Sequence, residues 1–251
     1  MVRGRVFIVG AGPGDPELLT IKAVRLIKTA EVVVYDRLVS ASIMKLVSEN
    51  AEKIYVGKRT GKHELTQEKI TELLIEKAHK GRKVVRLKGG DPFLFGRGGE
   101  EAEALADNNI DFEVVPGITS AIAAPAYAGI PLTHRDYASS VAIVTGHKAE
   151  NAERGVNWID IAGSVDTIVI LMGVEELENI AKQLVEGGLN PNTPAALIEW
   201  GTLKRQRSLT GKIGTIAEEV EKKNIKPPSV IVIGEVVNLG RQLSWFKKAP
   251  R

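Results

Sequence analysis

Cysteine is absent from this sequence, and its absence removes several kinds of chemistry at once. Disulfides, thiolate metal sites and cysteine nucleophiles all require that side chain, and none of the 251 residues supplies it. Aromatic residues make up only 5% of the chain. So low a content disfavours a surface that stacks the bases of a nucleic acid.

Long apolar runs are missing as well. No segment approaches the roughly 18 apolar residues of a membrane-spanning helix, and the opening residues MVRGRVFIVG lead into a strand-like run without the apolar core of a signal peptide. The net charge is only +3, and lysines alternate with glutamates along the expected helices, as is typical of solvated helix faces. We therefore predict a cytoplasmic protein that binds neither membranes nor nucleic acids. Its slight excess of base is compatible with a small acidic substrate.

Strand-like and helix-like runs alternate through the first half of the chain. A helix is expected to begin at Asp15-Pro16-Glu17, and another over residues 67–79, closed by Gly81. Such alternation predicts a parallel sheet joined by crossover helices. The strand-like runs are residues 5–9, 32–35, 53–56, 84–87 and 112–115.

Residues 116–138 are rich in Pro, Gly and Ala and break this rhythm. We place a domain junction there, which divides the chain into an N-terminal domain, 1–116, and a C-terminal domain, 117–251. In the second half a short Gly-containing turn links runs 195–198 and 206–210, which predicts an antiparallel pair and a mixed sheet. The other strand-like runs there are 141–145, 167–171 and 230–233, with helices near 174–186 and 215–223.

The segment VVRLKGGDPFLFGRGGEE, residues 84–101, is the most informative stretch of the chain. An apolar strand runs into a glycine-rich loop, and a helix is expected to open at Glu100. A loop of this kind lets its backbone closely approach a ligand or another segment. In an α/β sheet, ligands bind at the carboxyl ends of the strands. The segment therefore predicts a ligand pocket.

A second glycine-rich loop, VGAGPGD at residues 9–15, follows the first strand, and Asp36 ends the second strand. This arrangement is close to a dinucleotide-binding fingerprint. However, the glycines follow a G-x-G-x-G spacing, Pro13 removes a backbone donor, and Asp15 puts a carboxylate where a pyrophosphate would bind. A ligand without phosphate suits the loop better, while an NAD-dependent dehydrogenase and a purely structural turn remain alternatives.

Together these loops resemble the tetrapyrrole methylases that use S-adenosylmethionine, and most closely those that act on uroporphyrinogen III. The resemblance spans nearly the whole chain, and YDRLVS, VGKRTGKH and RLKGGDPFLFGRGGEE are its most specific motifs. The matching segments are residues 9–23, 35–40, 56–63, 86–101, 115–121, 131–138, 171–174 and 200–202.

The resemblance implies two α/β domains, usually in a homodimer, with the cofactor in the cleft between the domains. The first domain would hold the substrate and catalytic loops, and the second would complete the cofactor site. The implied reaction moves two methyl groups from S-adenosylmethionine to C2 and C7 of uroporphyrinogen III, which gives precorrin-2 for sirohaem and cobalamin, with S-adenosylhomocysteine as the other product. A precorrin methyltransferase, a diphthine synthase and a non-catalytic tetrapyrrole-binding protein remain alternatives.

The resemblance also implies roles for particular residues. Asp36 matches the family's proton acceptor and Lys58 its proton donor. Because the substrate is a polycarboxylate, we expect the basic residues of the motif loops to bind it, namely Arg37, Arg59, Lys62 and Arg97. The implied cofactor residues are Pro13, Gly89, Gly90, Asp91, Leu94, Thr119, Ser120, Met172 and Gly201.

Several of these residues also have structural interpretations that involve no ligand. Asp91-Pro92 is also a common turn opener, Met172 is more often a core residue, and Lys58 is more often a solvated lysine. No metal is expected, because the four histidines show no ligand spacing.

Overall fold

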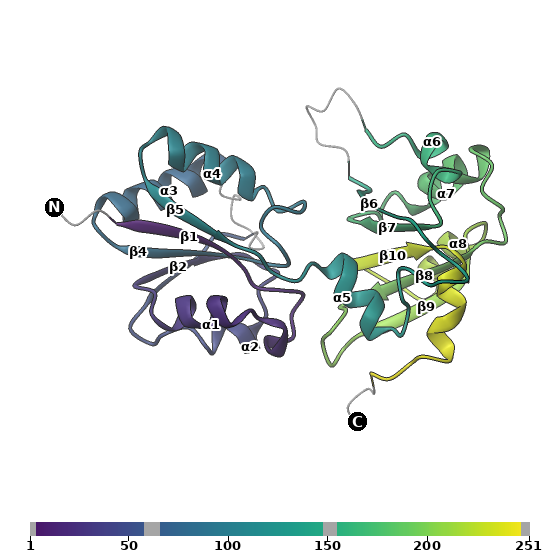
Figure 1. Cartoon of the computed structure of the whole chain (residues 1–251), viewed down its shortest axis with the longest axis horizontal. Coiled ribbons are helices and arrows are strands. Elements are labelled where there is room, and N and C mark those ends of the chain that lie inside the picture. Colours follow the sequence, from purple (N-terminus) through teal and green to yellow (C-terminus); the bar gives the residue numbers. More distant parts are fainter. Residues whose placement is uncertain (1–3, 58–65, 148–154, 247–251) are drawn as a thin grey trace. The chain divides into compact units, whose positions relative to one another are not determined.

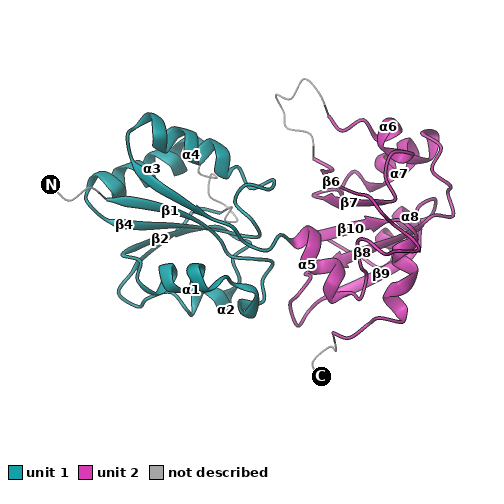
Figure 2. Ribbon diagram, viewed as in Figure 1, with its two compact units in different colours: residues 1–119 teal, residues 120–251 magenta. Residues whose placement is uncertain are grey.

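The computed structural model describes residues 4–57, 66–147 and 155–246. The chain divides into two compact units, Met1–Thr119 (unit 1) and Ser120–Arg251 (unit 2), each with its own five-stranded sheet (Figures 1 and 2). The boundary lies within the Pro-, Gly- and Ala-rich segment. No described helix combines the length and the apolar composition that crossing a bilayer requires.

The sheet of unit 1 is wholly parallel, in the order β3-β2-β4-β1-β5. This confirms the parallel sheet predicted from the alternation of strands and helices. Because every strand runs the same way, the loops that follow them all leave from one edge, the carboxyl edge. The strands are β1 (Arg5–Gly10), β2 (Val32–Tyr35), β3 (Glu52–Tyr55), β4 (Lys83–Lys88) and β5 (Asp111–Val115).

Helices cover both faces of this sheet (Figure 1). The shorter helices α1 (Ile21–Lys28) and α2 (Ala41–Met44) pack on one face, against buried residues such as Val85 and Leu87. The longer helices α3 (Gln67–His79) and α4 (Gly98–Asp107) pack on the other. Both faces of the central strand β4 are therefore buried, and a polar side chain there needs a partner.

The sheet of unit 2 is mixed, in the order β6-β7-β10-β8-β9. Strands β6 and β7 are parallel, and the other neighbouring pairs are antiparallel, including the predicted pair β8 and β9. The strands are β6 (Val141–Thr145), β7 (Thr167–Leu171), β8 (Pro194–Glu199), β9 (Arg207–Lys212) and β10 (Ser229–Ile233).

The core of unit 2 is apolar on both faces of its sheet. One face is covered by α6 (Trp158–Ala162), α7 (Leu177–Glu186) and α8 (Ile216–Lys222). The other face is covered by α5 (Ser120–Tyr127) and the 3-10 helix η2 (Glu235–Arg241). The two cores consist mostly of Ile, Val, Leu and Ala, so unit 2 is stabilised by burial of aliphatic side chains.

The first predicted helix is wrong as a single element. Asp15 does cap a helical turn, but that turn is the short 3-10 helix η1 (Pro16–Leu18), and Leu19 after it is extended. Thr20 then caps α1 as a separate helix, because its hydroxyl accepts a hydrogen bond from the Ala23 backbone nitrogen at 3.1 Å. A second capping residue, five positions after Asp15, thus begins a separate helix.

Candidate functional site

Backbone packs directly against backbone where β1, β4 and β5 end. A Cβ atom on Gly10 would lie 2.5 Å from the Gly117 nitrogen and 2.7 Å from the Gly90 oxygen. Gly12 and Gly90 also exchange backbone hydrogen bonds of 3.1 and 2.7 Å. Three loops that are distant in sequence therefore meet at one place, and only glycine permits so close an approach.

One side of this meeting point is open. Gly90 has a φ of 68°, and among the described residues a Cβ built on it would find no atom nearer than the Thr119 Cα, at 3.9 Å. The loop thus presents bare backbone to free space, as a site that binds a ligand through its main chain requires. Pro13 and Leu94 lie half-buried in the neighbouring loops, and Thr119 is buried.

The loops after β2 and β3 join the same edge. The Leu38 side chain lies over Gly89, where an added Cβ would meet the Leu38 Cβ at 2.6 Å. Gly57, after β3, is similarly close to the Arg37 backbone nitrogen, at 2.9 Å from an added Cβ. The structure therefore brings Asp36, Arg37 and the Gly89–Asp91 loop together, whereas the sequence only placed each of them after a strand.

Asp36 is held on both of its carboxylate oxygens. Its Oδ1 accepts a hydrogen bond from the Leu38 nitrogen at 3.1 Å, and its Oδ2 lies 3.6 Å from Nη2 of Arg86. The side chain remains 27% exposed. Asp36 is thus a positioned carboxylate with access to solvent, which a group that exchanges protons with a ligand needs.

The Asp91 carboxylate organises its own loop. Its Oδ1 accepts hydrogen bonds from the backbone nitrogens of Phe93 and Leu94, at 2.8 and 3.1 Å, and its Oδ2 accepts one from Gly117 at 3.0 Å. These contacts agree with the turn-opening interpretation of Asp91-Pro92. A carboxylate has about four lone-pair positions, so the contacts with described residues leave room for one further donor.

The two predicted substrate arginines of the described chain differ in their surroundings. Arg97 has a left-handed backbone and forms two hydrogen bonds with the Glu100 carboxylate, at 2.9 and 2.6 Å. Arg37 is exposed, and no hydrogen bond or ion pair joins it to another described residue. Arg37 is therefore available to an anion, whereas Arg97 would first have to exchange partners.

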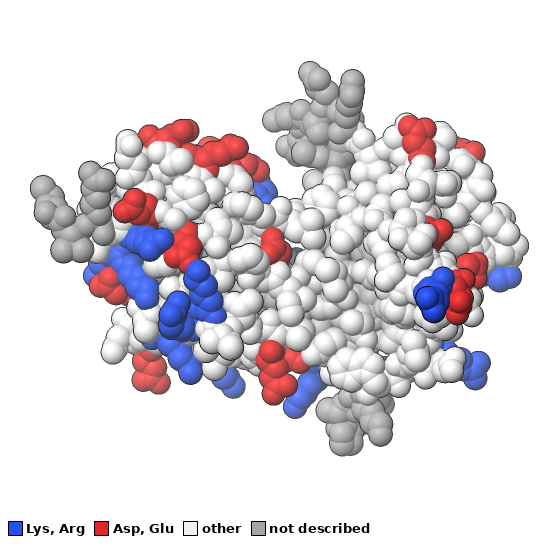
Figure 3. Space-filling view, in the orientation of Figure 1, with Lys and Arg blue, Asp and Glu red and all other residues white. Residues whose placement is uncertain are grey.

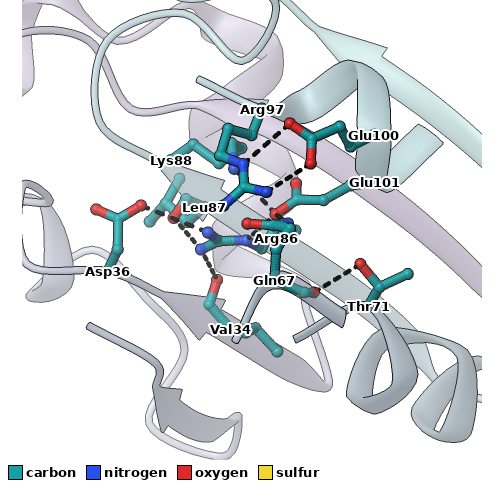
Figure 4. Close-up of polar contacts among 10 residues, drawn as sticks. All are labelled: Val34, Asp36, Gln67, Thr71, Arg86, Leu87, Lys88, Arg97, Glu100 and Glu101. Carbon is teal, nitrogen blue, oxygen red and sulfur yellow. Dashed lines mark hydrogen bonds and ion pairs between the residues drawn. The ribbon is translucent and has the colours of Figure 1, made fainter. Parts of the chain in front are cut away.

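A buried cluster of charges lies behind Asp36, and sequence reasoning missed it (Figure 4). Glu101 is fully buried, and its Oε1 accepts hydrogen bonds from Arg86 Nε at 3.0 Å and Lys88 Nζ at 2.9 Å. Burial alone would raise the pKa of Glu101, but the charges of Arg86 and Lys88 outweigh it, so the pKa lies below its usual range. Arg86 and Lys88, at positions i and i+2 beside the apolar residues of a central strand, were the available signal.

Strained backbone marks the loops of the predicted site in both units. Outside the Asn residues that end helices, the described non-glycine residues with positive φ are Phe95, Arg97, Met172, Trp200 and Thr202. All five lie in or beside segments that the resemblance assigns to ligand binding. Such conformations cost about 1–3 kcal/mol each and cluster at functional sites.

Two of the residues of unit 2 assigned to the cofactor, Met172 and Gly201, follow strands β7 and β8. Met172 is 54% exposed, so it is not the core residue that its side chain would suggest. Gly201 packs against α5, since an added Cβ would lie 2.4 Å from the Ala124 Cβ. Ser120 begins α5.

Three predicted residues, Lys58, Arg59 and Lys62, lie outside the described residues. Within the described ranges, no group of three or more His, Asp or Glu side chains could hold a metal ion. An open hollow of about 830 Å³ lies elsewhere in unit 1, among β2, α2 and β3, and none of the predicted site residues lines it. The candidate site therefore rests on the converging loops and not on this hollow.

A family model for tetrapyrrole (corrin/porphyrin) methylases matches residues 5–217. The chain belongs to the tetrapyrrole methylase family. It is 53% identical over 244 residues to the uroporphyrinogen-III C-methyltransferase of Bacillus subtilis, a match that covers 97% of this chain and 95% of that one.

Two further members of the tetrapyrrole methylase family extend this comparison. A siroheme synthase of Nitrosospira multiformis is 51% identical over 246 residues, but the chain spans only 52% of its length. A uroporphyrin-III C-methyltransferase of Thermus thermophilus, solved with S-adenyl homocysteine, has 43% identity and a TM-score of 0.82, over 94% of this chain and all of that one.

Proposed function

We propose that the protein transfers two methyl groups from S-adenosylmethionine to C2 and C7 of uroporphyrinogen III and so forms precorrin-2. The observation that carries this proposal is the 53% identity to a uroporphyrinogen-III C-methyltransferase over nearly the full length of both chains. Precorrin-2 is a precursor of sirohaem and cobalamin, which agrees with the siroheme synthase among the relatives.

The described residues fit S-adenosylmethionine. The exposed backbone at Gly90, among the glycines at the ends of β1, β4 and β5, suits a ligand without phosphate. The contacts of Asp91 with described residues leave one acceptor position on its carboxylate for an ammonium or a ribose hydroxyl. The proposed set is completed by Gly89, Pro13, Leu94, Thr119, Ser120, Met172 and Gly201. When bound, S-adenosylmethionine supplies a methyl group already activated by its sulfonium sulfur.

The chain then has to place the substrate and manage protons. A pyrrole carbon that gains a methyl group becomes part of a cation, and the macrocycle returns to neutrality when it loses a proton. Asp36 is the proposed acceptor of this proton, and its exposure at the carboxyl edge supports that role. Lys58 is the proposed donor.

Arginine and lysine side chains would bind the substrate through its carboxylates. Arg37 is the best supported of them, because it is exposed and unpaired among the described residues. Arg97 would exchange Glu100 for a substrate carboxylate, and Arg59 and Lys62 complete the proposed group. Bidentate contacts of this kind fit the planar guanidinium.

We propose unit 1 as the part with the substrate and catalytic loops and unit 2 as the part that completes the cofactor site. We also propose that the protein is a cytoplasmic homodimer that binds no nucleic acid. On the face shown in Figure 3, basic and acidic side chains lie side by side, which supports the last point.

Incubation with uroporphyrinogen III and isotope-labelled S-adenosylmethionine tests the function. A product that has gained two labelled methyl groups by mass supports the proposal, and the absence of methyl transfer rejects it. Methylation of a later precorrin but not of uroporphyrinogen III would indicate another branch of the family. Thermal protection by NAD but not by S-adenosylhomocysteine would instead favour a dehydrogenase.

A further inference from the structure

Glu101 connects three elements of unit 1 from inside the core. It lies in the first turn of α4, and its Oε1 accepts hydrogen bonds from Arg86 and Lys88 of β4 and from Gln67 Nε2 at 2.9 Å. Gln67 is the first residue of α3. Strand β4 and the beginnings of α3 and α4 are therefore tied to one oxygen atom (Figure 4).

The contacts of Arg86 leave one of its nitrogens for Asp36. Its Nε donates to Glu101, and its Nη1 lies within reach of two backbone carbonyls, those of Leu87 at 3.3 Å and Val34 at 3.5 Å. The remaining nitrogen, Nη2, lies 3.6 Å from Asp36 Oδ2. Because a guanidinium is planar and rigid, the contacts on Nε and Nη1 determine where Nη2 lies.

This cluster is poorly arranged for stability alone. Buried ion pairs often contribute less than apolar side chains of the same size, and Glu101 Oε2 is buried with no hydrogen-bond partner among the described residues. Burial also lowers the pKa of Lys88, with the Arg86 charge adding to the effect. Arg86 and Lys88 carry two positive charges, and Glu101 supplies only one negative charge. The second carboxylate near them is that of Asp36, which lies beside Arg86.

We propose that Glu101 is a positioning residue for Asp36, which it controls through Arg86, with Lys88 and Gln67 holding Glu101 in place. The inference rests on the catalytic role of Asp36 proposed above. It gives the end of the FGRGGEE motif a task beyond starting a helix, since the second glutamate is the one that is buried.

Glu101→Gln tests the proposal, with Glu103→Gln as the matched control. Both variants remove one negative charge from α4, but Glu103 is exposed and the cluster does not include it. We expect Glu101→Gln to lower kcat by about 10- to 100-fold, as displacement of a catalytic group can do, with little change in KM for S-adenosylmethionine. Equal kcat values for Glu101→Gln, Glu103→Gln and the unaltered protein would overturn the proposal.

A double-mutant cycle with Asp36→Asn separates positioning from general damage. If Glu101 acts through Asp36, adding Glu101→Gln to Asp36→Asn should cause no further loss of kcat. If the two losses multiply instead, Glu101 has only a structural role and the proposal is wrong. Should Glu101→Gln fail to fold, Gln67→Leu replaces it in the same cycle, with a smaller expected loss and the same two outcomes.

A readout without turnover keeps the inference separate from the proposed function. The carboxyl ¹³C signal of Asp36, assigned by its loss in Asp36→Asn, should shift in Glu101→Gln and stay unchanged in Glu103→Gln. An unshifted signal overturns the positioning role even if the protein methylates uroporphyrinogen III. A shifted signal in a protein without methyl transfer would support the geometry while rejecting the function.

Discussion

The central strands of the two sheets differ in whether they contain buried charged residues. Strand β4 of unit 1 contains Arg86 and Lys88, both nearly fully buried, whereas all five residues of β10 in unit 2 are buried and none is charged. Each strand is the third of five in its sheet. A central strand can thus carry buried charges toward the carboxyl end of its sheet, as β4 does, or contribute only uncharged residues to the core, as β10 does.

Among its described residues, unit 2 also buries a carboxylate, that of Glu199, but its contacts are of another kind. Glu199 ends β8 and pairs with Arg207 at the start of β9, and it also accepts a hydrogen bond from the Lys226 nitrogen at 3.0 Å. Arg207 is 45% exposed and lies on the edge strand β9, so this ion pair joins β8 to the edge of the sheet at the surface. The buried charges of unit 1 thus reach Asp36 at the carboxyl edge of the sheet, whereas the buried carboxylate of unit 2 joins β8 to β9.

Removing the carboxylate at Asp36 should have the largest effect. Asp36→Asn keeps the shape of the side chain, and we expect kcat to fall by about 10²- to 10⁴-fold, the usual contribution of a general base. Glu199→Gln is the matched change in the other sheet and should lower the melting temperature while leaving kcat largely intact. Steady-state kinetics and thermal unfolding of both variants measure the contrast. The comparison fails if the two variants lose activity equally.

The scaffold of unit 2 should respond mainly in stability. Leu184 of α7 is fully buried in the core, and Leu184→Ala should lower the free energy of unfolding by about 2–5 kcal/mol. The control is Ile159→Ala, because Ile159 is 50% exposed and its truncation should cost far less. Denaturant titration gives both values. A kcat of Leu184→Ala well below that of the unaltered protein, at a temperature where it is folded, would contradict the scaffold role.

The predicted substrate arginines should differ from one another. A hydrogen bond to a charged group contributes about 1.5–3 kcal/mol, so Arg37→Ala should raise the KM for uroporphyrinogen III by about 10- to 100-fold. The Arg97→Ala variant should show a smaller rise, because Arg97 is already paired with Glu100. Glu100→Gln should lower that KM by freeing Arg97. Unchanged KM values in both arginine variants would remove the arginines from the substrate site.

The smallest effect concerns acid stability in unit 2. Hydrogen bonds from the backbone and hydroxyl groups of Ser139 and Ser140 lower the pKa of Asp166 to about 2. Because the folded pKa lies below that of the unfolded chain, the stabilisation is complete above the unfolded pKa and is lost as the pH falls toward 2. The stability difference between the unaltered protein and Asp166→Asn should therefore shrink steadily below about pH 4. A difference that stays constant down to pH 3 would contradict this.

Much of the fold could be predicted from the chain alone. Period and flanking turn residues located β2, β6, β7 and α3 at the bounds that the structure has, because these runs are strongly patterned and end at clear breakers. Shorter helices were missed. Segments such as α2 and α6, of four and five residues, have no measurable period, and α5 combines alanines with Pro125.

The candidate site could be predicted in part. The glycine loops and Asp36 follow strands, so a parallel sheet had to bring them to one edge. The contact of Asp91 with Gly117 and that of Arg97 with Glu100 could not be foreseen, because they depend on how each loop folds. The burial of Glu101 could not be predicted either, since a second glutamate at a helix start looks like an ordinary first-turn acid.

The sequence by itself therefore determined the class of fold, the order of strands along the chain and the family. Hydrophobic periodicity, glycine spacing and the order of motifs can all be read along the chain without knowing which segments contact one another. Only the tertiary structure decided which charges are buried and with whom they pair. Glu101 and Arg86 are 15 residues apart, and Arg86 and Asp36 are farther still. Burial removes water as a partner, so each of these charges must find its counterion in the fold, and the place where they do so lies directly behind the proposed catalytic carboxylate.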